Sequence, residues 1–135
     1  MKINIQQIIF TFLSFLILGS CEEIGLDNNV IDRGLYSGPV VYRKYLYLKD
    51  STEPTLSTST VENQVKLLED KQGLFIENDS IKYYFDTDNN IEITTEYGYI
   101  KYKRTNNSID VNNRSEFKYT DSTVVNLGNG TLKKQ

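Results

Sequence analysis

Apolar and polar residues alternate along most of the chain after residue 39, in short runs separated by clusters of Asn, Asp and Gly. An alternation with a period of two is typical of a β-strand with one buried face. The regular spacing of these runs predicts an all-β fold, a single small antiparallel meander that forms a barrel or a sandwich. The runs predicted as strands are 40–49, 74–77, 80–85, 91–96, 99–104, 115–119 and 122–127.

The turns between these runs are predicted from their Asn, Asp and Gly content. The segment from Gly34 to Pro39 contains two glycines and a proline, which predicts a turn or bulge at the start of an edge strand. At the other end, Gly128-Asn129-Gly130 leads into a basic tail that we expect to be frayed. The internal turns are predicted at 78–79, 86–90, 97–98 and 105–108.

Two neighbouring segments lack a clear strand pattern. Residues 50–60 are rich in Ser and Thr and nearly devoid of apolar residues, so they are predicted to form a loop. In the segment 60–72, Val61, Val65 and Leu68 share a helical face, which allows a helix. The alternative is a strand over 64–69, closed by a turn at 70–73, and the hairpins that follow favour this alternative.

Composition supports β structure. The chain has no alanine and ten tyrosines, together with many Thr, Ile and Val residues. Alanine is the best helix former, whereas aromatic and β-branched residues favour strands. The order of a glycine-rich start, a long first strand and then hairpins resembles, in pattern alone, the small calycin-type barrels.

The first 20 residues have the features of a cleaved signal peptide. Lys2 gives a positive start, and an almost unbroken apolar run from Ile8 to Leu18 follows. This run has the length of a signal-peptide core and is shorter than the ~20 residues of a membrane-spanning helix. Small residues, Gly19 and Ser20, come next, and directly after them stands Cys21, the only cysteine of the chain.

Leu18-Gly19-Ser20-Cys21 resembles the lipobox of bacterial lipoproteins, in which a small residue precedes the cysteine that becomes lipidated. The resemblance implies cleavage before Cys21, a diacylglycerol on its sulfur and an acyl chain, such as palmitate, on its new amino group. The alternative is an ordinary secretory signal or an uncleaved anchor. Residues 1–20 would then be the signal peptide, 21–33 the lipidated cysteine and a tether, and 34–135 the β domain.

These features predict a protein of the cell envelope, held by membrane lipid through Cys21, at the outer membrane rather than the inner one. Removal of the signal peptide removes Lys2 and leaves 14 basic and 18 acidic side chains, a net charge of −4 before the termini. The charges are interspersed, so we expect no nucleic-acid partner.

Tyrosines crowd the predicted sheet and give the main candidate for a binding face. Tyr45, Tyr47, Tyr97 and Tyr99 are the residues selected for it. A tyrosine presents an apolar ring and a polar tip, which suits a sugar, a lipid headgroup or a protein partner. The alternative is that these rings only stabilise the sheet through cross-strand pairs.

The sequence offers little for catalysis or metal binding. There is no histidine and no free cysteine after lipidation, so no imidazole base, thiolate nucleophile or zinc site is expected. Residues 86–90 begin like a calcium loop, but Ile91 stands where that loop needs glycine. We therefore expect no metal and no cofactor apart from the lipid.

The function predicted from sequence is that of a membrane-anchored, non-enzymatic binding module for an envelope protein or a small ligand. The alternative is a structural or assembly accessory of an envelope complex, and a hydrolase is the least favoured class. Asp-Ser pairs in predicted turns, at Asp50, Asp79 and Asp121, resemble the O-glycosylation sites of some exported bacterial proteins.

Overall fold

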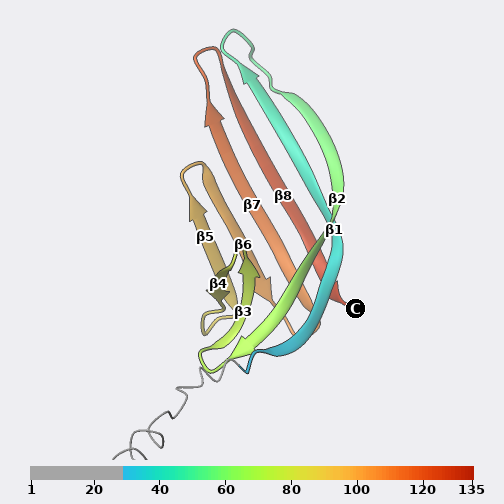
Figure 1. Cartoon of the computed structure of the whole chain (residues 1–135). Coiled ribbons are helices and arrows are strands. Elements are labelled where there is room, and N and C mark those ends of the chain that lie inside the picture. The colour runs from blue at the N-terminus through green and yellow to red at the C-terminus, as the bar shows by residue number, and fades with distance from the viewer. Residues whose placement is uncertain (1–28) are drawn as a thin grey trace, which may run out of the picture.

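The computed structural model describes residues 29–135, in which all helical or extended segments are β-strands and none is a helix. The prediction of an all-β antiparallel fold is therefore confirmed. Figure 1 shows the eight strands: β1 (Ile31–Leu48), β2 (Thr55–Asp70), β3 (Gly73–Asn78), β4 (Ile81–Tyr84), β5 (Asn90–Thr95), β6 (Gly98–Arg104), β7 (Ser108–Lys118) and β8 (Ser122–Lys134).

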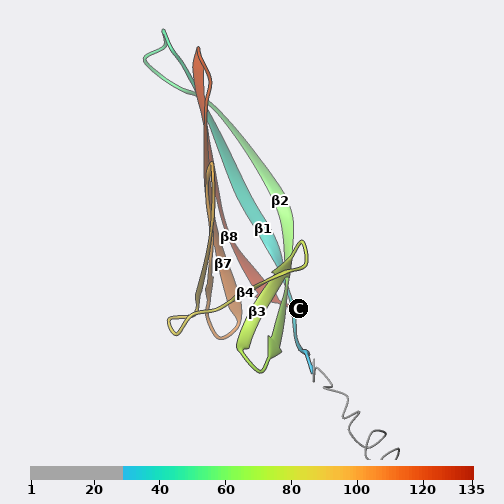
Figure 2. The ribbon, with the colours of Figure 1, turned by 60° about the vertical axis from the view of Figure 1, so that its left-hand side comes forward.

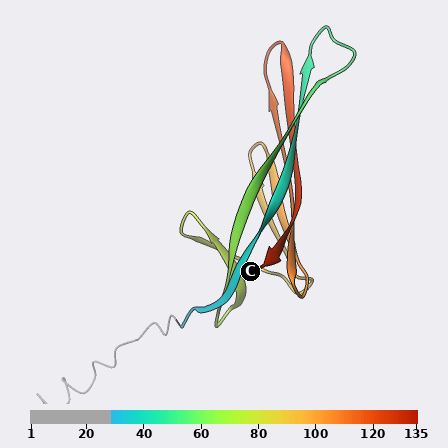
Figure 3. The ribbon, with the colours of Figure 1, turned by 90° about the vertical axis from the view of Figure 1, so that its right-hand side faces the viewer.

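These strands form one antiparallel sheet in the order β4-β3-β2-β1-β8-β7-β6-β5. Apart from β4 and β5, strands that are consecutive in sequence are neighbours in the sheet, and the first and last strands also pair, as in an up-and-down barrel. One seam stays open among the described strands, between β4 and β5. The sheet is thus nearly closed into a barrel. At the open seam the β3–β4 hairpin projects to the left in Figure 3, away from β5 to β8.

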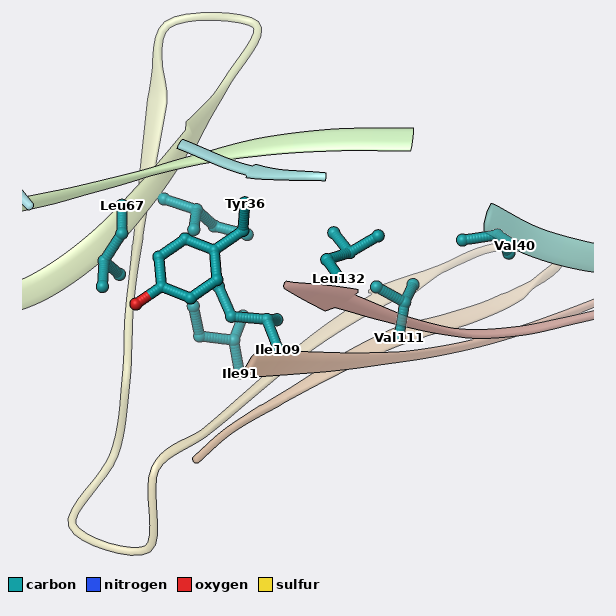
Figure 4. Packing of buried hydrophobic residues seen from close by; sticks show 8 residues of the cluster. Tyr36, Val40, Leu67, Ile91, Ile109, Val111 and Leu132 are labelled. Carbon is teal, nitrogen blue, oxygen red and sulfur yellow. The ribbon is translucent and has the colours of Figure 1, made fainter. Parts of the chain in front are cut away.

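The hydrophobic core lies at the end of the molecule where all eight strands are present, which we call the base (Figure 1). Side chains from β1, β2, β3, β5, β7 and β8 meet there, and Figure 4 shows their packing. Burying one such aliphatic side chain contributes ~1.5–3 kcal/mol. The cluster consists of Tyr36, Val40, Leu67, Ile76, Ile91, Ile109, Val111 and Leu132.

Above the base, four strands continue as a single layer in the order β2-β1-β8-β7 (Figures 1 and 2). We call this part the blade and define it as residues 45–56 and 116–125, where β7 has passed the end of β6. No residue of the blade is buried. The two halves of the same sheet therefore differ in whether a core exists at all.

β1 lies in the centre of the sheet, between β2 and β8, so the prediction of an edge strand at its start is wrong. A bulge does occur, between Asp32 and Gly34, and Gly34 has a φ of 118°. On the β8 side of β1, Ser37 pairs with Lys133 and Val40 pairs with Gly130 in the same register. Gly38 and Pro39, which lie between them, form no pair with β8. Because proline has no backbone N–H, the central strand tolerates it by interrupting this one ladder.

The predicted loop 50–60 is wrong in its second half, because β2 begins at Thr55. Residues 55–60 pair with residues 41–46 of β1. Apart from Leu56 the segment has no apolar residue, and both of its faces are exposed, so it leaves no hydrophobic alternation in the sequence. The strand predicted over 64–69 is confirmed as part of β2, and the helix allowed over 60–72 is wrong.

The prediction of a frayed basic tail is also wrong. β8 continues to Lys134, and Lys133 and Lys134 pair with Ser37 and Tyr36 of β1. Leu132 is completely buried. A single apolar residue between glycines and lysines gives no periodic signal, so the local pattern does not predict this end of β8.

The hairpins in the middle of the chain follow the prediction within one or two residues. The β3–β4 turn consists of Asp79 and Ser80, both with positive φ, one residue later than predicted. The predicted strand 115–119 is the end of a longer strand, β7, whose first half carries the buried residues Ile109 and Val111.

β1 begins at Ile31, so the last three residues of the predicted tether belong to the sheet. The predicted signal peptide, the lipobox residues Leu18, Gly19 and Ser20, and Cys21 lie outside the described residues.

Candidate ligand-binding site

A pocket with a volume of about 380 Å³ lies at the junction of the base and the blade. Most of its lining comes from positions that face the same side as the core, which we call the inner face. Strand register places Tyr42 opposite Gly128, Gly128 opposite Asn113 and Asn113 opposite Ile100, in one row across four strands. The lining residues are Tyr42, Thr95, Tyr99, Ile100, Asn113, Arg114, Ser115 and Asn126.

Gly128 is required at this position of β8 because the side chains of the neighbouring strands lie over it. A Cβ atom added to Gly128 would lie 2.5 Å from Oδ1 of Asn113 and 2.7 Å from Cε1 of Tyr42. The absence of a side chain on the middle strand thus lets a tyrosine ring and an amide approach each other beside the pocket.

The polar groups of the pocket are amides and hydroxyls. Nδ2 of Asn63 donates a hydrogen bond of 3.2 Å to the Tyr42 hydroxyl, which fixes that end of the ring. Nδ2 of Asn126 donates to Oγ of Ser115 over 3.1 Å. Among residues 29–135, the side-chain amide of Asn113 has no hydrogen-bond partner, so both its donor and its acceptor groups are available.

The lining contains no carboxylate. Its one charged residue, Arg114, directs its guanidinium to Glu116, with Nη2 3.4 Å from Oε2. The site therefore offers neutral donors, neutral acceptors and an aromatic ring edge. Such a set can hold the hydroxyl or amide groups of an uncharged molecule, and its volume falls within the usual range for small-molecule sites, roughly 300–1,000 Å³.

The four tyrosines selected from the sequence do not all come together. Tyr45 and Tyr47 occupy outer-face positions of the blade in β1, and Tyr99 occupies an outer-face position of β6. Tyr97 instead stacks on Phe117, an inner-face residue, with ring centroids 4.8 Å apart. Lys101 places its Nζ 4.8 Å from the Tyr99 ring. Only Tyr99 also lines the pocket.

Sequence reasoning missed the pocket residues Tyr42, Asn113 and Asn126. Tyr42 and Asn126 lie within the predicted strands 40–49 and 122–127, whereas residues 109–114 lie in no predicted strand. A usable signal was the pair Asn113 and Ser115, spaced by two residues in a strand, because residues spaced in this way lie on the same face.

A second polar cluster surrounds Asp70 at the end of β2. Its carboxylate accepts hydrogen bonds from Nζ of Lys82 and from the Tyr84 hydroxyl, both 2.8 Å long, and from the N–H of Gln72. The hydrogen bond from Lys82 is the main cause that lowers the pKa of Asp70 from 3.8 to about 2. Phe75, completely buried, lies beneath Lys82 and Tyr84. The cluster ties the β3–β4 hairpin to β2.

The Asp-rich turn 86–90 is held by its own side chains. Oδ1 of Asp86 accepts hydrogen bonds from the N–H groups of Asp88 and Asn90, and Arg104 donates to Oδ1 of Asn89. Within residues 29–135, no three His, Cys, Asp or Glu side chains are grouped so as to hold a metal ion. No helix in that range is long and apolar enough to cross a membrane.

No model of a protein family matches the sequence, and no curated protein and no solved structure matches this chain.

Proposed function

We propose that this protein is a lipid-anchored, non-enzymatic binding module of a bacterial envelope, and that it holds a small uncharged, hydroxyl-rich ligand such as a sugar in its inner-face pocket. The observation that carries this proposal is the unpaired amide of Asn113 beside the Tyr42 ring in a pocket without carboxylates. A neutral amide pairs well with hydroxyl groups, and an aromatic ring suits the apolar face of a sugar.

The lipobox resemblance supports the location. Between Cys21 and the start of β1 at Ile31 lie nine residues. A flexible chain of this length spans about 15–18 Å. The base of the domain, where β1 begins, would therefore stay close to the membrane surface.

The binding proposal is tested by calorimetry on the full-length protein purified in detergent, titrated with glucose, galactose, mannose and N-acetylglucosamine. We expect saturable heat with at least one sugar, and loss of that heat in Asn113→Ala. The matched control is Asn112→Ala, because Asn112 is the next residue of β7 and faces the outer side. Absence of saturable heat with all four sugars, or equal binding by Asn113→Ala, would contradict the proposal.

The anchor is tested separately in cells. Cys21→Ser should move the protein from the membrane fraction to the soluble fraction and abolish incorporation of radioactive palmitate. A Cys21→Ser protein that still sediments with membranes would show that another segment holds it there.

A structural accessory is the second candidate, and one observation favours it: along residues 55–66, one edge of β2 pairs with no strand among the described residues. A hydrolase has weaker support. Catalysis by paired carboxylates needs two of them in a cleft, and the inner-face pocket has none. A second hollow is lined by Asp86, Glu92 and Asp110, but each of these carboxylates already has a partner in its turn or in the sheet.

A further inference from the structure

One edge of the sheet is long and open. β2 pairs with β1 along Thr55–Glu69, but on its other side it pairs with β3 only from Leu67 to Asp70. Residues 55–66 therefore have a strand on one side only among the described residues. Figure 1 shows this part of β2 running freely along the side of the molecule, above the β3–β4 hairpin.

The direction of the backbone groups along this edge follows from the β2–β3 turn. Asp70 and Gly73 are paired across a turn of two residues, so they form a hydrogen-bonded pair. Every second residue of β2 then directs its N–H and C=O away from β1. The free edge thus presents the backbone groups of Leu56, Thr58, Thr60, Glu62, Gln64 and Lys66.

Proteins usually protect such edges with short strands, prolines, bulges or charged residues. The other exposed edges of this sheet are short: β4 has four residues and β5 has six. The free part of β2 contains no proline and no bulge, and only Glu62 and Lys66 are charged. Residues 55–62 are all exposed. An open, regular and mostly uncharged edge of this length is complementary to another β-strand.

We propose that this edge pairs antiparallel with the same edge of a second copy of the chain, about a two-fold axis at Thr60. The axis is perpendicular to the sheet, so the inner faces of both copies lie on one side of the joined sheet and their outer faces lie on the other side. Thr60 then lies opposite Thr60 of the second copy, Thr58 opposite Glu62, and Leu56 opposite Gln64. The two sheets would join into one continuous sheet.

Charge complementarity selects a second copy and this register. Arg43 is paired with Thr58 in β1 and β2 and is exposed. With the axis at Thr60, Glu62 of the second copy lies opposite Thr58, in the same row as Arg43 and on the same face. Moving the axis to Val61 would instead bring the two Glu62 carboxylates to diagonal positions, where like charges repel. The paired segment 56–64 also ends before Leu67, where β3 begins to occupy the edge.

The arrangement is compatible with lipid anchoring. In an antiparallel pair the two bases lie at opposite ends of the joined sheet, and so do the two amino-terminal tethers. Both anchors reach one membrane when the strands lie along its surface. The proposal does not depend on the ligand proposed above, because neither Tyr42 nor Asn113 belongs to the edge.

The test uses cysteine cross-linking of the full chain in its own membranes. Thr60→Cys places two thiols on directly opposed residues, ~5.5 Å apart between Cα atoms, which a disulfide spans. In Thr58→Cys the thiols lie about 14 Å apart, since each faces residue 62 of the other copy. After mild oxidation, a non-reducing gel should show a dimer for Thr60→Cys and only monomer for Thr58→Cys and for the wild type. The wild type, whose only cysteine is Cys21, shows directly whether Cys21 itself forms cross-links.

A second measurement does not depend on disulfide geometry. Thr60→Lys puts the ammonium groups of the two copies directly opposite each other. Thr58→Lys instead puts each ammonium group opposite Glu62 of the other copy. Light scattering on the detergent-purified protein should show dimerisation weakened about two- to fivefold by Thr60→Lys and less by Thr58→Lys. A cross-link that is strongest at residue 58, a cross-link absent at residue 60, or equal dimerisation of both lysine variants would overturn the proposal.

Discussion

The base and the blade share four strands but are stabilised in different ways. All nine buried hydrophobic residues among those described lie in the base or in its β3–β4 hairpin, and the blade has none. β1 passes from one region to the other: Tyr36 and Val40 are buried, whereas Tyr47 and Leu48 are 44% and 50% exposed. A strand of this sheet is therefore not uniformly stable along its length.

In the blade, the stabilising contacts are backbone hydrogen bonds and cross-strand side-chain pairs. Tyr45 lies opposite Leu56 and Val125, and Leu46 lies opposite Val124. Each such pair contributes only ~0.2–1 kcal/mol. The base therefore provides most of the free energy of folding, and the blade extends from it as a surface with two accessible faces. Mutations in the two regions should differ accordingly.

The largest effect is expected from Leu132→Ala. Leu132 is completely buried in the base, opposite Ile109, and its truncation leaves a cavity among side chains that cannot fully collapse. Such a change costs ~2–5 kcal/mol of the free energy of unfolding. Urea unfolding followed by circular dichroism measures it. A loss below 1 kcal/mol would mean that the base does not carry the stability.

A smaller loss of the free energy of unfolding is expected from Gly128→Ala, at the junction of the base and the blade. The added methyl group must displace the Asn113 amide and the Tyr42 ring, because its Cβ would lie 2.5 Å and 2.7 Å from their atoms. Overpacking of this kind costs ~1–3 kcal/mol. The same variant should lose sugar binding in the titration, because both displaced side chains line the pocket. Unchanged stability together with unchanged binding would contradict this description of the junction.

The base should also respond to acid through Asp70. Its pKa is lowered to about 2 in the folded protein, mainly by the hydrogen bond from Lys82, against 3.8 for the unconstrained group. A lowered pKa means that the carboxylate stabilises the fold above pH ~4 and that this contribution is lost as the pH falls toward 2. Asp70→Asn should lower stability at neutral pH and flatten its dependence between pH 4 and 2. Parallel pH profiles of the variant and the wild type would rule out this role.

The difference between the two regions also explains how far the sequence could be interpreted. The hairpins around Phe75, Ile91 and Ile100 were predicted because one face of each strand is covered, which leaves an alternation in the sequence. The first half of β2 was predicted as a loop because neither of its faces is covered. Its strand structure comes from pairing with β1, which a local pattern does not record.

The pocket could not be predicted from the sequence for a related reason. It is assembled from β1, β5, β6, β7 and β8, and their contacts depend on the pairing of the first strand with the last. The number of tyrosines predicts a tyrosine-rich face, but the face of the sheet on which each ring lies depends on turn geometry. Tyr97, for example, stacks on the inner-face residue Phe117. Polar residues that lie on one face only after long-range pairing cannot be grouped from spacing alone.

The smallest effect is expected from Leu56→Ala in the blade. Leu56 is 52% exposed, so truncation removes little buried area and leaves no cavity. We expect a loss of no more than ~0.5 kcal/mol in the same urea experiment, although the residue type and the substitution are those of Leu132→Ala. Hydrogen exchange adds a second readout, because blade amides should exchange faster than those of β8 around Leu132. A loss above 1 kcal/mol, or equal protection of the two regions, would mean that another surface covers the blade in solution.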